Sequence, residues 1–374
     1  MNIRLIEQFA ALHPYREEWD RLVEQSPTST VFQTFEWLES WWDVFGDQYR
    51  LLVLLGFEGD ALVAAAPLVL SEKRMFSRQM RCLEFAASMR ADYADFLYRD
   101  QEDLRGLVRA LRTELAWEVL NFDRIPSVSP TLGVLAEEFP GWRGTRFLDD
   151  VGPTYLFGPG QDGNDVLGKK NARRLLTRFS KAGTVAVRHL TQADLIAPEL
   201  EAFFEQHVAR RALTEAPSLF LDPRYRTFYR RLTERLAPPG WLLFSAVTLN
   251  DQPVAFHYGF LYGRRLLWYK PSFSVSHGRF SPGEVLILEL FKYCQAQGLA
   301  EFDFGMGVEP YKERFANATR QNLKFQAFRS GAFQQLGHAD RALRESAKRL
   351  GLARQLYAGW RRVLGRLGQG ASPE

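Results

Sequence analysis

The stretch EFDFGMGVEPYKERF, residues 301–315, holds the densest group of candidate catalytic residues in the chain. Residues 301–304 predict a short buried strand, and two glycines then bracket a sharp turn. An acid, a phenol and an amine follow where a helix is predicted to begin. A carboxylate can take a proton from an attacking amine or hydroxyl, and a phenol can protonate a leaving thiolate. The candidate acid–base residues are Asp303, Glu309, Tyr311 and Lys312.

A second turn, SHGRFSPG at residues 276–283, opens an apolar helix predicted over residues 282–297. Backbone N–H groups of a glycine-containing turn and the positive end of a helix together favour phosphate. An ordinary strand-to-helix loop is the alternative, because the spacing lacks the Lys-Ser/Thr of a phosphate-binding loop. The candidate phosphate-binding residues are Gly278, Arg279, Phe280, Ser281, Pro282 and Gly283.

The composition is that of a soluble globular protein with room for two domains: 374 residues, 46% hydrophobic and 25% charged. A net charge of +4 does not by itself demand a nucleic-acid partner. The two cysteines are far apart and the six histidines are scattered, so we expect neither a disulfide framework nor a metal site. We find no signal peptide and no membrane-spanning stretch, and expect a cytoplasmic protein.

The predicted elements repeat the order helix, hairpin, strand, helix, strand. The first copy has helices at residues 32–45 and 102–115 and strands at 51–57, 61–70, 80–85 and 117–122. The second has helices at 165–181, 195–213, 223–236 and 282–297, and strands at 184–189, 241–249, 254–261, 264–269, 302–304 and 324–328. We interpret this as a weak internal duplication in an α/β (α+β) protein. The expected domains are 1–150 and 151–335, with a linker at 145–163 and a basic helical tail at 336–374.

A basic helix is predicted at residues 169–181, where Lys170, Arg173, Arg174, Arg178 and Lys181 share one broad side. A polyanionic substrate could lie across this side, although a solvated surface is the simpler interpretation. The basic tail could likewise touch acidic lipid or RNA as a peripheral contact, or be a packed, solvated helix. An aromatic cluster of Trp37, Trp41 and Trp42 is interpreted as core rather than as a sugar platform.

Three segments resemble a known family: residues 32–46 (FQTFEWLESWWDVFG), residues 169–183, and residues 281–315 with the run Glu309-Pro310-Tyr311-Lys312. Together they extend over most of residues 30–330. They are similar to the GNAT acyltransferase superfamily, in the branch with two tandem GNAT-like domains. The resemblance is greatest to the CelD-type acetyltransferases of cellulose biosynthesis, which are related to the FemAB aminoacyltransferases.

The resemblance implies two tandem domains, each with a mixed, mostly antiparallel sheet flanked by helices, and acetyl-CoA or another acyl-CoA lying where two strands splay apart. The loop before the helix that starts at Pro282 would meet the pyrophosphate, Trp268 and Tyr269 would contact the donor, and Tyr311 would protonate the CoA thiolate. Lys170, Arg173, Arg174 and His257 would bind substrate. The turn at residues 305–308 departs from the family pattern and lacks its Arg and Asp. The first domain lacks a comparable loop, so we expect it to be degenerate and to shape the substrate cleft.

Three functions fit the sequence. One is transfer of an acyl group, most simply acetyl, from acyl-CoA to an amine or hydroxyl on a small-molecule, saccharide or envelope-linked acceptor. The second is aminoacyl transfer from charged tRNA to a cell-envelope precursor, as in FemAB proteins. The third is a non-enzymatic polysaccharide-assembly protein built on a decayed GNAT fold.

Overall fold

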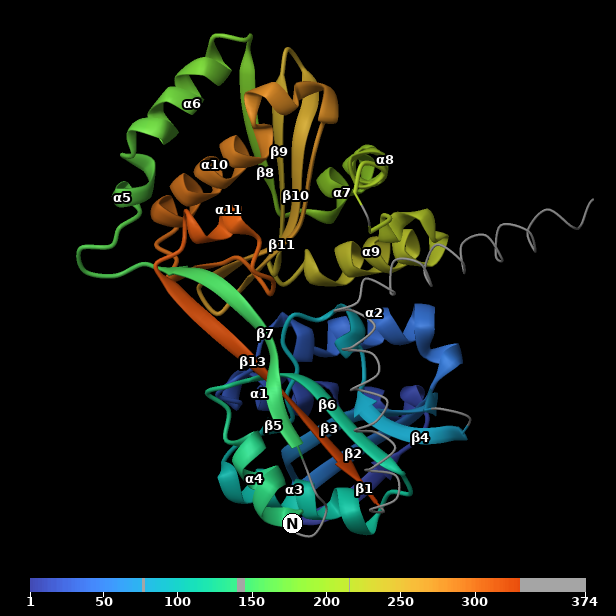
Figure 1. The fold of residues 1–374 in the computed structure, drawn as a ribbon. Coiled ribbons are helices and arrows are strands. Elements are labelled where there is room, and N and C mark those ends of the chain that lie inside the picture. Colours follow the sequence, from blue (N-terminus) through green and yellow to red (C-terminus); the bar gives the residue numbers. More distant parts are fainter. Residues whose placement is uncertain (76–77, 140–144, 215, 330–374) are drawn as a thin grey trace, which may run out of the picture.

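The computed structural model describes residues 1–75, 78–139, 145–214 and 216–329, and in these residues 13 strands form one continuous sheet (Figure 1). The first half supplies β1 (Asn2–Ile6), β2 (Arg50–Glu58), β3 (Ala61–Met75), β4 (Arg78–Phe85), β5 (Leu97–Tyr98) and β6 (Val119–Pro126). The rest supplies β7 (Thr145–Leu156), β8 (Val185–Leu190), β9 (Leu242–Leu249), β10 (Gln252–Tyr262), β11 (Arg265–Phe273), β12 (Glu301–Asp303) and β13 (Ala318–Phe328).

Helices cover both faces of this sheet. Those of the first half are α1 (Arg16–Gln25), α2 (Phe35–Phe45), α3 (Gln101–Thr113) and α4 (Thr131–Glu138). Those of the second half are α5 (Asn164–Leu167), α6 (Lys170–Ser180), α7 (Ala193–Ile196), α8 (Leu200–Arg211), α9 (Pro223–Leu236), α10 (Pro282–Ala296) and α11 (Pro310–Glu313). The mixed α/β architecture expected from the sequence is confirmed. No helix in the described ranges is long and apolar enough to cross a membrane.

The two halves have the same topology and exchange their last strands. In each half four strands pair antiparallel, β1 to β4 and β8 to β11. A helix-containing connection then adds a parallel neighbour, β6 beside β4 and β12 beside β11. Strand β7 follows the first half but pairs with β12, whereas β13 follows the second half and pairs with β6. Because β7 and β13 also pair with each other, the sheet runs unbroken through both halves.

The predicted linker at residues 145–163 is wrong in its first part, since residues 145–156 form β7. Within β7, Gly152 is needed for close packing and not for a turn. A Cβ on Gly152 would lie 2.9 Å from the carbonyl oxygen of Gly305, so only glycine lets β7 approach the turn after β12 this closely. The expected domain boundary at residue 150 stays a prediction and falls within this strand.

Most other predicted elements are confirmed to within a few residues, with two interruptions. The helix predicted at 165–181 is broken into α5 and α6 at Gly168 and Lys169, and the one at 195–213 is broken around Pro198. Proline lacks the N–H that a continuous helix requires. Thr34 caps α2, as a threonine directly before a helical pattern predicts, because its hydroxyl accepts a hydrogen bond from the Trp37 N–H at 3.3 Å. The predicted tail at 336–374 lies outside the described residues.

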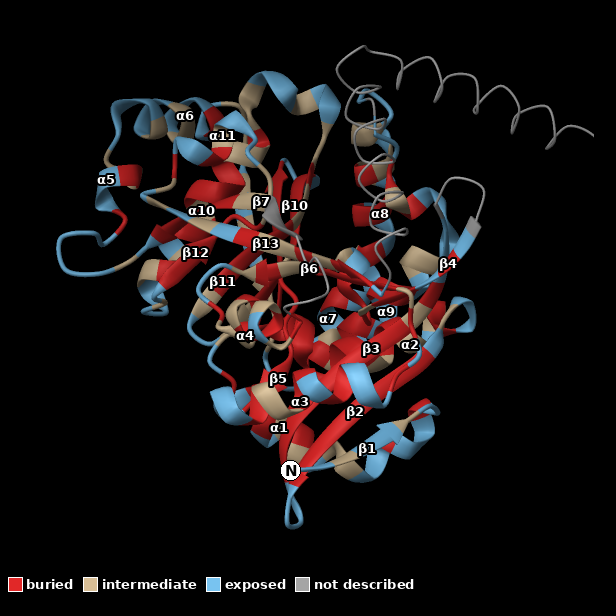
Figure 2. Ribbon diagram, turned by 60° about the horizontal axis from the view of Figure 1, so that its bottom comes forward, coloured by how far each residue is buried: buried red, intermediate tan, exposed pale blue. Residues whose placement is uncertain are grey.

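One aromatic core joins the halves, and most of the sheet is buried beneath the helices (Figure 2). Trp37 of α2 is fully buried and meets three rings of the second half edge-on. The ring centroids lie 5.4 Å from Phe228, 5.8 Å from Phe260 and 6.1 Å from Tyr269. The interpretation of the tryptophan cluster as core is confirmed for Trp37 and Trp41, while Trp42 is half-buried. The halves are therefore packed as one unit.

We predict that Trp37→Ala lowers the free energy of unfolding by about 3–5 kcal/mol, because it empties a core site shared by both halves. Thermal and urea unfolding should still show a single transition. The matched control is Trp42→Ala on the same helix, where the half-exposed ring should cost less than about 2 kcal/mol. Equal costs for the two variants, or loss of a transition from one half only, would contradict the shared core.

Candidate functional site

The site is built where β11 and β12 part. These parallel strands pair at three positions, the last being Leu267 with Asp303. Strand β11 continues to Phe273, whereas β12 ends at Asp303 and the chain turns away at Gly305. Successive side chains of a strand point to opposite faces. Accordingly, Trp268 packs with α10 on one face, and Leu267 and Asp303 line a cavity on the other.

The cavity on the α10 face, called here the donor cavity, has a volume of about 240 Å³. It joins both turns picked out from the sequence. Its lining residues are Arg210, Trp268, Pro271, Phe273, Gly278, Ser281, Pro282, Gly283, Glu284, Ile287 and Tyr311. The structure thus brings one predicted catalytic residue, Tyr311, together with most of the predicted phosphate-binding turn.

Trp268 holds Tyr311 in place by a hydrogen bond. Its hydroxyl accepts a hydrogen bond from the Trp268 indole N–H at 3.1 Å, and burial raises the pKa of Tyr311. Trp268 in turn stacks on His257, with ring centroids 4.6 Å apart. Burial lowers the pKa of His257 to about 3, so this ring is neutral, and it has no exposed surface. His257 therefore supports Trp268 from behind rather than lining the cavity.

Glu309 and Lys312, two other predicted catalytic residues, form a turn-locking pair. The Lys312 side chain is buried and donates to the carbonyl oxygens of Met306 at 2.8 Å and Gly307 at 3.3 Å. It also pairs with Glu309 at 2.8 Å, whose side chain is 55% exposed. The ammonium thus serves the backbone of the turn, and Tyr311 is the member of the group that faces the cavity.

The turn itself is fixed by two carboxylates from different halves. Gly305 has φ of +66°, and a Cβ there would lie 2.4 Å from Oδ2 of Asp92. Its N–H donates to Oδ1 of Asp303 at 2.8 Å. Glycine is required both for the backbone conformation and for the approach of Asp92.

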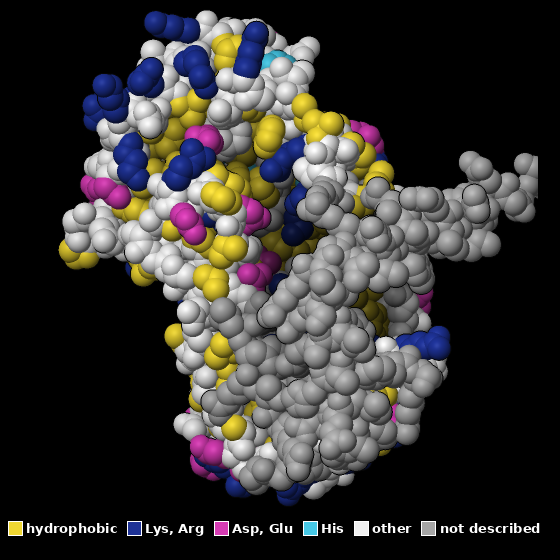
Figure 3. Space-filling model, viewed as in Figure 1, with side chains coloured by type: hydrophobic (Ala, Val, Ile, Leu, Met, Phe, Trp, Pro, Cys, Tyr) yellow, Lys and Arg dark blue, Asp and Glu magenta, His cyan; other side chains and the backbone are white. Residues whose placement is uncertain are grey.

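A basic groove of about 790 Å³ adjoins the donor cavity and shares Ser281 and Glu284 with it. Its cationic residues come from α6: Lys170, Arg173, Arg174, Arg178 and Lys181. Figure 3 shows Lys and Arg gathered over this part of the surface. Ser281 precedes α10 with φ of +51°, a strained conformation for a residue with a side chain. The one carboxylate shared with the cavity, Glu284, is paired with Arg314 at 2.7 Å.

Three predicted donor-site residues, Tyr269, Arg279 and Phe280, do not line the donor cavity. Phe280 packs edge-on against Phe179, with ring centroids 6.5 Å apart. Tyr269 points into the aromatic core between the halves, where its hydroxyl donates to the Arg90 carbonyl oxygen at 2.5 Å. Arg279 is exposed and lies over the ring of Phe280 at 4.6 Å from its centroid. Of the predicted cations, those of α6 are the ones that line the groove.

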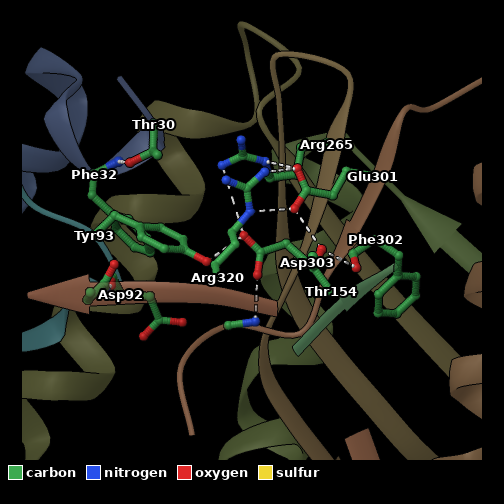
Figure 4. A network of polar contacts seen from close by, with 12 residues as sticks. Thr30, Phe32, Asp92, Tyr93, Thr154, Arg265, Glu301, Phe302, Asp303 and Arg320 are labelled. Carbon is green, nitrogen blue, oxygen red and sulfur yellow. Dashed lines mark hydrogen bonds and ion pairs between the residues drawn. The ribbon is translucent and has the colours of Figure 1, made fainter. Parts of the chain in front are cut away.

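The other face of the strand opening carries a charged network that the sequence analysis missed (Figure 4). Glu301 accepts two hydrogen bonds from Arg320, at 2.7 and 2.5 Å, and one from Arg265 at 2.9 Å. Burial opposes ionisation of Glu301, but these two arginines lower its pKa overall. Asp303 accepts from the Tyr93 hydroxyl at 2.7 Å, and its side chain has no exposed surface.

The sequence did hold a signal for this network. In a strand predicted to be buried, Glu301 and Asp303 alternate with Phe302 and Phe304. Because successive side chains of a strand point to opposite faces, the two carboxylates share one polar face. Nothing local indicated that Tyr93 or Arg320 would meet them. Arg210 lines the donor cavity and donates to the Pro271 carbonyl oxygen at 2.9 Å. It is one of two adjacent arginines at the end of a helix, and no local pattern in the sequence predicted its place in the cavity.

Comparison with known proteins agrees with this geometry. Residues 168–313 match the family model described as acetyltransferase (GNAT) domain. No curated protein matches the chain significantly. Among solved structures, FemX aligns with a TM-score of 0.60 at 10% identity, over 90% of this chain and 99% of its own.

Two further structures align over nearly their whole lengths. The C-terminal domain of a putative lysylphosphatidylglycerol synthetase from Agrobacterium fabrum has a TM-score of 0.54 at 13% identity, over 88% of this chain and 96% of its own. A tandem GNAT protein from the clavulanic acid biosynthesis pathway has a TM-score of 0.50 at 12% identity, over 87% and 98%. These likenesses show the fold. Residues 168–313 therefore match a GNAT acetyltransferase domain, and the chain as a whole has a fold similar to that of FemX and of a tandem GNAT protein.

Proposed function

We propose that the protein transfers an acyl group, most simply acetyl, from acyl-CoA to an amine or hydroxyl acceptor. The GNAT domain supports acyltransferase activity in general. The observation that carries the specific proposal is the path formed by the donor cavity and the basic groove, which meet at Ser281. Its apolar end lies at the strand opening and its cationic end lies on α6, as an acyl thioester joined to phosphates requires.

The residues present fit such a donor part by part. In the first turn of α10, Pro282 has no N–H, and the N–H groups of Glu284 and Val285 bond to the Ser281 carbonyl oxygen at 3.0 and 3.2 Å, which leaves the Gly283 N–H as the donor for an anion. This N–H and the positive end of the helix suit the diphosphate, while the cations of α6 suit the remaining phosphate. Trp268, Phe273 and Ile287 give the pantetheine arm an apolar wall. Glu284 would oppose an anion but is neutralised by its pairing with Arg314.

Direct transfer needs a proton donor for the departing sulfur. In the proposed reaction the acceptor attacks the thioester carbon and gives up a proton, the carbon–sulfur bond breaks, and Tyr311 donates its proton to the thiolate and regains one from solvent. The raised pKa of Tyr311 keeps the phenol protonated at neutral pH. No covalent enzyme intermediate is required, so the protein contributes mainly orientation and proton transfer.

A saccharide or envelope-linked acceptor, as the CelD resemblance implies, and a cytoplasmic location are part of the proposal. The second candidate is aminoacyl transfer from charged tRNA. Its support is the likeness in fold to FemX together with the volume of the basic groove, which exceeds that of the donor cavity. A phosphate backbone would use the same α6 cations.

Calorimetry with acetyl-CoA tests the donor. We predict saturable binding, and a dissociation constant raised about tenfold or more in Arg173→Ala/Arg174→Ala, because two cations facing the phosphates are lost. The control is Arg231→Ala, which removes an exposed arginine from α9 and should leave binding unchanged. No binding at millimolar acetyl-CoA would overturn the proposal. Tight binding of charged tRNA in its place would favour the second candidate.

Kinetics of Tyr311→Phe test the proton donor. We predict that kcat falls about 10²-fold or more while the dissociation constant for acetyl-CoA changes little, since the variant loses the proton-donating hydroxyl but keeps the ring. Tyr293→Phe, which alters a half-buried phenol of α10 that packs on His189, is the control and should keep its activity. An unchanged kcat in Tyr311→Phe would exclude this role.

A further inference from the structure

We propose that the cleft on the opposite face of the β11–β12 opening is the acceptor site, that Asp303 is its general base, and that it takes amine or hydroxyl acceptors without phosphate groups. This inference rests on the proposed function, since it assigns the second substrate of the same reaction. It differs from the donor assignment in using other residues, another face of the sheet and both halves of the chain.

The two substrates would meet at the strand opening from opposite sides. Trp268 lines the donor cavity, and its neighbour Leu267 lines the opposite cavity with Asp303. Leu267 and Asp303 form the last pair before the strands separate. An acceptor beside Asp303 therefore faces the place where the thioester end of the donor path reaches the sheet. A sheet that stayed paired here would keep the two sides apart.

The acceptor cleft consists of two adjoining cavities, of about 410 and 470 Å³, which share Ser29, Thr30, Tyr93 and Arg265. Three of these shared residues come from the first half and one comes from β11. Aromatic rings of Trp241, Phe260 and Tyr262 line one cavity, and hydroxyl and amide side chains line the other. The first half thus supplies part of the binding surface, as the sequence led us to expect of a domain that shapes the cleft.

Buried polar atoms in this cleft point to a ligand. Asp303 has no exposed surface, yet it lines the cavity. Asn322, also fully buried, donates to the Asp92 carbonyl oxygen at 2.6 Å, while its own Oδ1 has no partner within the described part of the chain. An unsatisfied buried acceptor carries a cost that a ligand hydroxyl or N–H would remove.

Charge in the cleft argues against a phosphate-bearing acceptor. Both guanidinium groups, Arg265 and Arg320, are bound to the single carboxylate Glu301. Asp303 lies beside them, and Glu24 lies at the edge of the cavity. The arginines are therefore committed to protein carboxylates, in contrast to the α6 groove, where cations face solvent. The cleft suits a neutral or amine-bearing molecule.

Asp303 is placed to act as a base at neutral pH. Burial raises its pKa to about 6, and the nearby charge of Glu301 also raises it. The charge of Arg265 and hydrogen bonds from Tyr93 and the Gly305 N–H oppose this rise. Arg320 also faces it, and Asp92 lies on the other side of the Gly305 turn. The carboxylate is thus mainly ionised above pH 6, yet more basic than an ordinary aspartate.

The reaction then balances without another component. The acceptor nitrogen or oxygen forms a bond to the thioester carbon, its proton passes to Asp303, and the carbon–sulfur bond breaks as Tyr311 protonates the sulfur. Tyr93 lines the cleft but exchanges no proton with either substrate in this scheme. It is a positioning residue, because its hydroxyl orients the Asp303 carboxylate and lowers its pKa.

The test measures CoA release with glucosamine and glucosamine 6-phosphate, and with glycerol and glycerol 3-phosphate, as pairs that differ by one phosphate. We predict that the unphosphorylated member of each pair has a kcat/KM at least about tenfold higher, because both arginines of the cleft are already bound to Glu301 and cannot pair with a phosphate. We also predict that Asp303→Asn lowers acceptor-dependent transfer by about 10²–10⁴-fold while acetyl-CoA binding stays as in the unaltered protein.

The pH dependence separates a base from a structural residue. The transfer rate of the unaltered protein, divided by that of Asp303→Asn, should rise with pH and level off above about pH 6. Tyr93→Phe should move this rise to higher pH, because it removes a hydrogen bond that favours the ionised carboxylate. Tyr262→Phe, at the same cavity without contact to Asp303, is the control and should leave the rise in place.

Preference for the phosphorylated members, full transfer by Asp303→Asn, or an unmoved pH profile in Tyr93→Phe would overturn this inference. So would a protein that binds acetyl-CoA but transfers to none of the four compounds. Failure to bind acetyl-CoA is a different result, since it overturns the proposed function itself.

Discussion

The separation of β11 from β12 after the Leu267–Asp303 pair is the constraint on which the site depends. A continuous sheet must satisfy its backbone groups between strands, so an opening within it is tolerated only where other groups hold the edges. Here the turn after β12 is held by Asp303 and Lys312, which bind its N–H and carbonyl groups. Gly305, with φ of +66°, turns the chain away at this point, so that β11 has no β12 partner beyond Leu267 while it stays paired with β10.

The first half stabilises this opening from the side opposite α10. Tyr93 reaches Asp303, and Asp92 packs against Gly305. The exchange of β7 and β13 places each half's last strand in the other half, and the Trp37 core closes the space between them. The first half thus serves the site, because it holds the turn after β12 and, in our proposal, lines part of the acceptor cleft.

Local patterns predicted the parts of the structure that depend on local forces. The glycine-bracketed turn at 305–307, the helix that starts at Pro282 and the Thr34 cap are each set by neighbours in sequence. Side-chain roles that depend on distant partners were not accessible. Lys312 resembled a catalytic amine but turned inward to carbonyl groups, and Tyr269 was expected at the donor but lies in the core. Residues 145–156 resembled a linker because Gly152 serves a close contact with Gly305, more than 150 positions away in the chain.

A structure of the protein with acetyl-CoA bound would test the central claim most directly. The account predicts the diphosphate at the N-terminal end of α10, beside the Gly283 N–H, and the thioester beside Trp268 and Tyr311, at the opening between β11 and β12. It also predicts that the Asp303 side stays free for the acceptor. A thioester located on the Asp303 face, or a CoA bound away from α10 altogether, would contradict it.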